Sequence, residues 1–281
     1  MFMFKKRKKE SVAIPFLASM IVTLILVGLP VSKIYSKLLE NKEANEAKKN
    51  SLIFTPTVEN DTTILFVYDT DDNSLRDSYA VLRTSAVNKS FIFIPVSNDM
   101  LCGNKKMSEI YKQGGVIELQ AAIEKTLDID IQRYMKLNDK AFTLVCDAFG
   151  GVNYNVPDGL RGLNEGTQYL SSEFILKLIS NKKFAEDART VTTGSVLSEM
   201  ISQTTGSRFS DALDYTFNSL INLVQTDITS IDYENQKDAI EYIFNSNQFK
   251  ASYRIPTGEK TDAGLKVDKQ FLEEIQEELG I

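Results

Sequence analysis

Carboxylates crowd the end of an apolar run near residue 68. The segment YDTDDNSLRDS (68–78) contains Asp69, Asp71, Asp72 and Asp77, and Arg76 precedes the last of them. Carboxylates at the carboxyl end of a buried strand can hold a hard divalent cation, and that cation neutralises a phosphate-bearing ligand in the adjoining cleft. The segment therefore predicts a cation and phosphate site, and a solvated acidic turn is the alternative.

The same segment begins like a calcium-binding loop but does not continue as one. An EF-hand loop needs glycine at its sixth position and glutamate at its twelfth. Counted from Asp69, these positions hold Ser74 and Ala80. The EF-hand interpretation is therefore excluded.

A second group of charged residues precedes a pair of glycines. Lys105, Lys106 and Lys112 lie just before Gly114 and Gly115. We expect a helix to begin near Gly115 and to offer its backbone N–H groups and positive dipole to an anion. Helix starts with nearby lysines are common, so this signal is weak by itself.

A third candidate is the arginine of AEDARTVTTG. Arg189 follows Glu186 by three residues on an expected helix. That spacing alone favours a surface ion pair with Glu186 over contact with a ligand.

The chain contains no histidine. This excludes imidazole bases, Ser-His-Asp triads and zinc sites that use histidine. Cys102 and Cys146 form no CxxC pair, and we interpret them as two small buried or half-buried thiols rather than as a disulfide. Chemistry must then rest on carboxylates, Arg, Lys, hydroxyls or a hard metal ion.

Composition limits the size and the partners of the protein. With 281 residues and 43% hydrophobic residues, the chain can form one well-buried domain plus a short appendage. The formal net charge is −6, although five basic residues lie within residues 1–11. The remainder is therefore strongly acidic, and we expect no nucleic-acid partner.

The N-terminus predicts a membrane anchor. Residues 1–10 form a basic tail, and the charge-free run that follows is long enough for a transmembrane helix at 11–33. A cleaved secretory signal is the alternative, but its apolar region is usually shorter. The positive-inside rule predicts a cytoplasmic N-terminus, a stalk or linker at 34–60 and an extracytoplasmic domain at 61–281 of a single-pass protein in the cell membrane.

Apolar runs in the outer part alternate with amphipathic helices. Four runs rich in β-branched and aromatic residues predict strands at 62–70, 78–85, 90–96 and 141–148. Helical patterns are expected at 114–131, 172–180, 194–203, 209–224, 238–246 and 267–279. This mixture predicts an α/β fold, a three-layer α/β/α-type sandwich with a central mixed sheet.

The stretch FTLVCDAFGGVNYNVP (142–157) is interpreted as a hairpin. An apolar strand ends at Cys146, Gly150 and Gly151 permit positive φ, and VNYNV resumes with alternating character. The two glycines are thus expected to reverse the chain between two strands.

The motifs, taken in order, resemble those of the LytR-CpsA-Psr family, also called the cell envelope-related transcriptional attenuator domain. The resemblance covers about residues 60–279 and rests on these residues: Asp69, Arg76-Asp77-Ser78, Ile94-Pro95, Tyr111, Gly114-Gly115, Asp147, Gly150-Gly151-Val152, Glu186 and Arg189, followed by RIPTGEKTDAGLKVD (254–268). The pairing of YxxGG with DAxGGV behind an anchor is fairly specific.

The resemblance implies a fold, an activity and a set of ligands. Members enclose an apolar groove for a polyprenyl lipid and transfer a glycopolymer from polyprenyl pyrophosphate to peptidoglycan or another wall acceptor. Their arginines clamp the pyrophosphate and their aspartates bind Mg²⁺. Carried onto this chain, Asp77 and Arg189 are the expected catalytic residues, and Asp69 and Asp77 the metal ligands. The expected pyrophosphate-binding residues are Arg76, Arg83, Lys105 and Arg189.

The sequence departs from this family pattern at several basic positions. Val96 follows the Ile-Pro pair where the family has an arginine, and Thr192-Thr193 replaces an expected Arg-Gln. Leu178-Ile179-Ser180 likewise stands where clamp arginines are expected. Each charge-assisted phosphate contact contributes roughly 1.5–3 kcal/mol. Pyrophosphate binding would weaken greatly unless other cations, Arg83, Lys105, Lys106 or Arg161, take their place.

Three hypotheses remain open at this point. The first is a Mg²⁺-assisted glycopolymer phosphotransferase. The second is a non-catalytic relative that binds the lipid-linked precursor or acts as an adaptor in cell wall assembly. The third is an unrelated extracellular sensor domain on an anchor.

Overall fold

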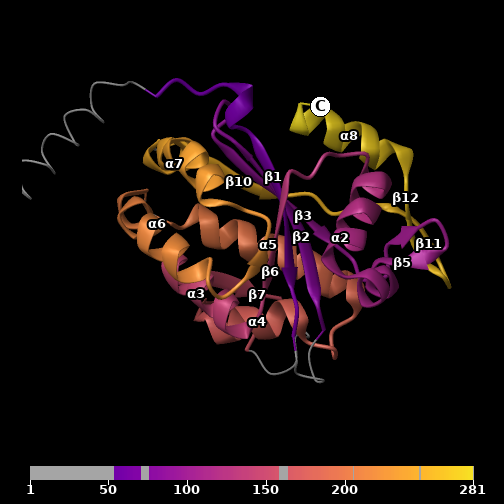
Figure 1. The fold of residues 1–281 in the computed structure, drawn as a ribbon. Helices are drawn as coiled ribbons and strands as arrows, with labels where there is room; N and C mark the ends of the chain where they lie inside the picture. Colours follow the sequence, from indigo (N-terminus) through magenta and orange to yellow (C-terminus); the bar gives the residue numbers. More distant parts are fainter. Residues whose placement is uncertain (1–53, 71–75, 158–163, 205, 247, 281) are drawn as a thin grey trace, which may run out of the picture. The chain divides into compact units, whose positions relative to one another are not determined.

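The computed structural model describes residues 54–70, 76–157, 164–204, 206–246 and 248–280. Residues Pro56–Ile281 form one compact unit (Figure 1). The predicted basic tail at 1–10, the transmembrane helix at 11–33 and most of the stalk lie outside the described residues. Within the described ranges, no helix combines the length and the apolar character needed to cross a bilayer.

A six-stranded mixed sheet forms the centre of this unit. Its strands lie in the order β10-β3-β2-β1-β6-β9. Their bounds are β1 (Thr62–Tyr68), β2 (Ser78–Ser85), β3 (Ser90–Val96), β6 (Arg133–Leu137), β9 (Gln225–Thr226) and β10 (Lys250–Tyr253). Strands β1, β2 and β3 are antiparallel neighbours, whereas β6 runs parallel to β1 and β10 parallel to β3. The mixed sheet and its first three strands are as predicted.

Helices α2 (Met107–Leu127) and α8 (Lys269–Leu279) cover one face of the sheet (Figure 1). The side chains of Val116, Leu119, Ile123 and Leu127, which follow helical spacing, are buried against the strands. Helix α2 begins earlier than expected, at Met107, and Gly115 interrupts it with φ 72° and ψ −159°. The glycine pair therefore marks a kink rather than the first turn.

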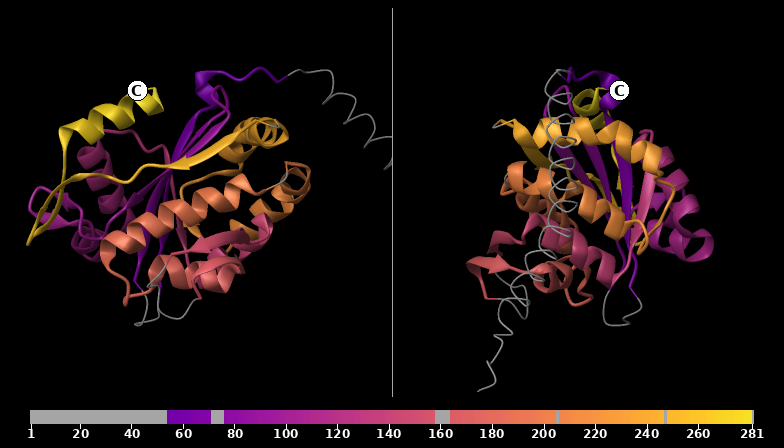
Figure 2. Two further views of the ribbon diagram at one scale, coloured as in Figure 1. Left: turned by 180° about the vertical axis from the view of Figure 1, so that it is seen from behind. Right: turned by 60° about the vertical axis from the view of Figure 1, so that its left-hand side comes forward.

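A second group of helices covers the opposite face of the sheet (Figures 1 and 2). They are α3 (Asp139–Phe149), α4 (Ser172–Ser180), α5 (Glu186–Ser202), α6 (Gly206–Leu220) and α7 (Ser230–Asn245). Apolar side chains of α3, α4 and α5 form a second core with the sheet. Because alternate residues of a strand point to opposite faces, β1 contributes Leu65 and Val67 to the first core and Tyr68 to the second. The three layers follow from this alternation.

The prediction of a strand at 141–148 is wrong. These residues belong to α3, whose N-cap is Asn138; its side chain accepts a hydrogen bond from the Ala141 N–H at 2.9 Å. Ala141, Phe142 and Cys146 point into the core. The run is short enough to fit either period, and the cap residue before it favours a helix.

The hairpin interpretation of the glycine pair is corrected in the same way. Gly150 adopts φ 84° as the C-cap of α3, and Gly151 follows with φ 72°. Both N–H groups donate to the Cys146 carbonyl, which is the usual way for a helix to end in left-handed glycine. The chain then enters β7 (Val152–Val156), which pairs with β8 (Gly166–Leu170) in a separate two-stranded sheet. The glycines thus join a helix to a strand.

The remaining elements are short. They are η1 (Val58–Asn60), the pair β4 (Leu101–Cys102) and β5 (Lys105–Lys106), and the pair β11 (Gly258–Thr261) and β12 (Gly264–Val267). Cys102 is half-buried and Cys146 is buried, and both are free thiols.

Candidate functional site

The ends of two neighbouring strands bring the two predicted metal ligands together. Tyr68, the last residue of β1, pairs with Ser78, the first residue of β2, so Asp69 and Asp77 flank the same end of the sheet. The Asp77 carboxylate accepts a hydrogen bond from the Thr70 N–H at 3.4 Å. Burial raises the pKa of Asp77, and the neighbouring Asp69 raises it further, against the opposing effects of Thr70 and Lys112. In the described part of this segment, Asp69 and Asp77 therefore form a partly buried pair of carboxylates.

Arg189 also lies at this end of the sheet, but it is buried. Its side chain is 2% exposed. Nη2 and Nε donate to the two Glu186 oxygens at 2.6 and 3.2 Å, and Nη1 donates to Ser78 Oγ at 2.6 Å and to the Ile179 carbonyl at 2.7 Å. The predicted ion pair with Glu186 exists, but inside the protein rather than at its surface. Arg189 joins α5 to β2 and to the end of α4.

Glu186 neutralises a second arginine. Arg76 Nη1 donates to Glu186 Oε2 at 3.1 Å, and the Arg76 side chain remains 37% exposed. The other oxygen of Glu186 accepts from the Asn98 N–H at 2.7 Å and from Ser97 Oγ at 3.2 Å. Two of the three predicted arginines, Arg76 and Arg189, therefore share one buried carboxylate, and of the two only Arg76 reaches solvent.

Two lysines complete the charged end of the sheet, and neither was singled out as a substitute for the missing arginines. Lys136 of β6 forms an ion pair with Asp69, with 2.5 Å between Nζ and Oδ2. Its Nζ lies 5.8 Å from the centre of the Tyr111 ring. Lys112 of α2 is exposed and lowers the pKa of Asp77. The strand RYMKL that carries Lys136 was not predicted, because its two basic residues hide its apolar ones.

Arg83 and Lys105 are not part of this cluster. Arg83 lies five residues along β2 from Ser78, which corresponds to about 17 Å of extended chain. It forms an ion pair with Asp61 at 3.2 Å. Lys105 donates to Gln113 at 3.1 Å, and Lys106 pairs with Asp99 at 2.9 Å. Asp71, Asp72 and Arg161 lie outside the described residues.

The carboxylates fit a magnesium ion only in a limited way. Within the described ranges, no three Asp, Glu, Cys or His side chains are placed to hold a metal ion together. Asp69 and Asp77 form a pair. Mg²⁺ commonly takes one or two carboxylates and completes its shell with water and substrate phosphates. The pair therefore suits Mg²⁺ when a phosphate ligand supplies further oxygens.

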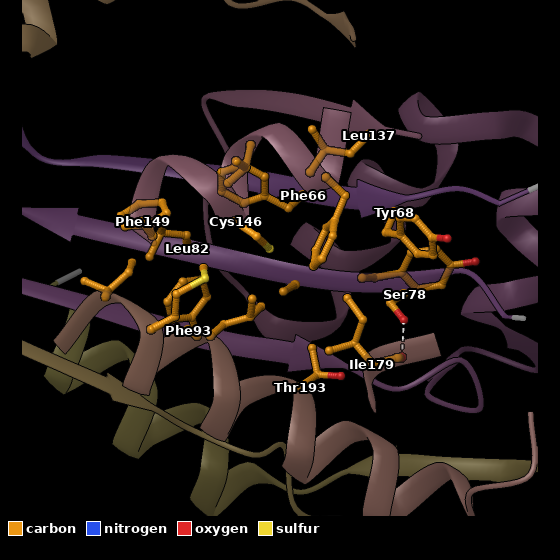
Figure 3. A pocket seen from close by; sticks show the side chains of 17 residues that line it. Phe66, Tyr68, Ser78, Leu82, Phe93, Leu137, Cys146, Phe149, Ile179 and Thr193 are labelled. Atoms are coloured by element: carbon orange, nitrogen blue, oxygen red, sulfur yellow. Dashed lines mark hydrogen bonds between the residues drawn. The ribbon is translucent and has the colours of Figure 1, made fainter. Parts of the chain in front are cut away.

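An apolar cavity begins beside this charged end. It has a volume of about 120 Å³ and lies between the sheet and helices α3, α4 and α5. Figure 3 shows Tyr68 and Ser78 at one end of the cavity and Phe149, Leu82 and Phe93 at the other. Ser78 lines the cavity and also accepts the hydrogen bond from Arg189. The cavity and the charged cluster therefore meet at Ser78 and at Ile179, which also lines the cavity and whose carbonyl also accepts from Arg189.

A second apolar cavity continues along the same face of the sheet. Its volume is about 230 Å³. The two cavities share the lining residues Phe66, Leu82, Val145, Phe149 and Ile201. The second cavity extends to the beginning of β1 and to helices α6 and α7. Together they form a long apolar slot, with the cluster around Asp77 and Arg189 at one end and the ion pair of Arg133 with Asp232 in the lining of the second cavity.

A family of known proteins matches most of this chain. The model of the LytR_cpsA_psr family matches residues 29–254, more than half of the chain. The chain belongs to the LytR_cpsA_psr family. The resemblance inferred from the motifs is thereby confirmed. Among curated proteins, this chain is similar to TagU of Bacillus cereus (strain AH820), which is named polyisoprenyl-teichoic acid–peptidoglycan teichoic acid transferase. The identity is 33% over 89 residues, which span 30% of this chain and 29% of TagU.

Solved structures share the LytR_cpsA_psr fold. A crystal structure of a protein from Eubacterium siraeum DSM 15702 superposes with a TM-score of 0.71 at 21% identity, over 82% of this chain and 95% of that one. TagT bound to LIIa-WTA superposes with a TM-score of 0.60 at 18% identity, over 81% of this chain and 92% of TagT. These similarities support the mixed α/β architecture.

Proposed function

We propose that this protein transfers a glycopolymer from a polyprenyl diphosphate carrier to peptidoglycan or another cell wall acceptor. The observation that carries the proposal is the apolar slot that ends at Ser78, beside Asp77 and Arg189. An isoprenoid chain fits an apolar slot, and a diphosphate fits an end that carries cations. The names of TagU and of TagT bound to LIIa-WTA support the same substrate class.

Three cations are placed to receive the diphosphate. Arg76, Lys112 and Lys136 are each at least partly exposed beside the two aspartates. Arg189 instead holds Glu186 and Ser78 in place, because its guanidinium already donates inside the protein. We therefore assign Arg189 a positioning role and assign the direct contacts to the three exposed cations.

Asp69 and Asp77 would hold Mg²⁺ together with the diphosphate. When bound, the ion supplies charge stabilisation to the phosphoryl oxygens. The acceptor hydroxyl oxygen forms a bond to the phosphorus that carries the glycan, and the bond from this phosphorus to the bridging oxygen breaks. Polyprenyl phosphate leaves with the bonding electrons. Asp77 is assigned as the carboxylate that takes the hydroxyl proton.

We further propose that the protein is anchored by residues 11–33, with the N-terminus in the cytoplasm and the domain outside. The charge-free length of this run and the basic residues before it support the anchor. An outward-facing domain would meet lipid-linked glycans at the membrane surface.

A non-catalytic role is the second candidate, and one observation favours it. Glu186 neutralises both Arg76 and Arg189, which lowers the positive charge available to a diphosphate. A protein with this balance could hold a lipid-linked precursor without transferring it.

The two candidates differ in turnover. The full chain in detergent micelles is incubated with a lipid-linked oligosaccharide, an acceptor and Mg²⁺, and released polyprenyl phosphate is measured. Transfer predicts release by the wild-type protein, loss of release in Asp77→Ala, and normal release in the surface control Lys177→Met. Saturable binding without release would instead establish the precursor-binding role.

A further inference from the structure

Lys136 already occupies part of the site assigned to a divalent cation. Its Nζ lies 2.5 Å from Asp69 Oδ2, and the side chains of Lys136 and Asp69 are 30% and 33% exposed. The strand that carries Lys136 runs parallel to β1, with Lys136 beside Val67 and Leu137 beside Tyr68. Sheet pairing therefore places the ammonium next to one of the two carboxylates.

A buried aromatic ring holds the ammonium from another element. Nζ lies 5.8 Å from the centre of the Tyr111 ring, and Tyr111 is buried on α2. A ring face attracts a cation, so Tyr111 favours this position of the lysine. Lys136 nevertheless stays partly exposed, and its four-carbon chain is flexible enough to turn toward a ligand at the mouth of the site.

We propose that Lys136 is an exchangeable counter-ion, which neutralises Asp69 in the free protein, competes with a divalent cation for this carboxylate, and contacts a diphosphate oxygen when both ligands bind. The inference rests on the proposed diphosphate site and assigns it a residue that couples its two ligands.

The coupling follows from charge. A divalent cation that binds Asp69 alone must displace the ammonium or lie beside it, and both cost free energy. A diphosphate gives the displaced ammonium a new anionic partner. Metal and diphosphate should therefore strengthen each other's binding, and by the same factor, because coupling between two ligands is reciprocal.

The first test needs no lipid and no turnover. Binding of Mn²⁺ alone to the full chain in detergent micelles is followed by electron paramagnetic resonance of the free ion. Lys136→Met should bind Mn²⁺ at least about threefold more tightly than wild type, since it lacks the competing charge. Lys136→Arg should stay close to wild type, and Asp69→Asn should weaken binding. Lys177→Met removes a lysine from a surface pair with Glu173 at 2.6 Å and should change nothing.

The second test measures coupling with geranyl diphosphate as a soluble probe. Its affinity is determined with and without Mn²⁺, corrected for the complex that the two form in solution. Wild type should show an increase in affinity with Mn²⁺ that Lys136→Met largely loses. The far-ultraviolet circular dichroism of each variant verifies that it is folded.

The outcomes separate the two proposals. Unchanged or weaker Mn²⁺ binding by folded Lys136→Met, or no binding by any variant, overturns the competition. Tighter Mn²⁺ binding with unchanged coupling overturns the contact with diphosphate. If both tests succeed but no polyprenyl phosphate is ever released, the counter-ion role stands and only the transferase function fails.

Discussion

The Arg189 guanidinium and the Glu186 carboxylate form a buried, bidentate ion pair one turn apart on α5. Ser78 and the Ile179 carbonyl occupy the third nitrogen of the guanidinium, so the pair joins the helical layer to the sheet. Arg189, which spacing alone assigns to the surface, thus links α5 to β2 and α4 beneath the candidate site.

Removing the carboxylate of this pair should strongly destabilise the protein. In Glu186→Gln the buried Arg189 loses its counter-charge, and we expect a loss of about 3–5 kcal/mol in the free energy of unfolding. Denaturant titration of the folded domain measures this loss. Glu173→Gln, in the exposed pair with Lys177, is the matched control and should change stability by less than about 1 kcal/mol. Similar small losses of unfolding free energy in both variants would argue against this structural role of the Arg189–Glu186 pair.

The pH dependence of stability should report the unfavourable burial of the ionised Asp77 carboxylate. Because burial raises the pKa of Asp77 in the folded state, its contribution to stability is fully present only while the carboxyl is protonated in both the folded and the unfolded protein. This contribution is lost as pH rises through the folded-state pKa. Asp77→Asn should therefore stabilise the protein at pH 7. The difference should vanish below about pH 4, where an unfolded aspartate is also protonated. A constant difference across this range would contradict the assignment.

Filling the apolar slot should block the lipid while leaving the fold intact. Ala80 is buried on β2 and lines the cavity next to the charged end. In Ala80→Phe the ring would occupy the 120 Å³ cavity, so the fold should lose no more than about 1–3 kcal/mol. Binding of farnesyl phosphate, measured by calorimetry, should weaken at least about tenfold, or 1.4 kcal/mol. Ala121→Phe, on the exposed side of α2, should bind normally.

Arg76 and Arg83 were both predicted to bind pyrophosphate, but substitution of each should have a different effect. Arg76→Met should weaken binding of geranyl diphosphate several-fold and cost at most about 1 kcal/mol of stability, because its ion pair is partly exposed. Arg83→Met removes the partner of the buried Asp61 carboxylate and should destabilise the fold, with diphosphate affinity unchanged. Isothermal titration and thermal denaturation of both variants measure the contrast. A loss of affinity in Arg83→Met would return that residue to the site.

Local pattern was sufficient for the elements whose residues all agree. Strands β1 and β3 are runs of mostly β-branched and aromatic residues, β2 carries an apolar run at 79–82, and the buried face of α2 follows helical spacing. In these segments each residue's local preference and its burial in the fold favour the same structure, so the local pattern identifies that structure.

The sequence pattern predicted the wrong structure where a strand and a helix are both compatible with it, and it missed a strand whose charged residues hide its buried ones. The run 141–148 has enough β-branched residues for a strand, but Asn138 caps a helix before it and Gly150 ends that helix after it. Strand β6 was not predicted, because Arg133 and Lys136 interrupt its apolar residues. Both become clear only when the neighbouring elements are in place.

The positions of Asp69 and Asp77 along the chain are enough to bring them together, because they flank one short connection between two strands. The cations that join them depend on how distant segments pack. Lys136 reaches Asp69 through the parallel pairing of β6 with β1, and Arg189 is withdrawn from solvent by packing of α5 against β3 and α4. The physical reason is that strand order and helix docking depend on the burial of surfaces far apart in the chain, which no local spacing encodes.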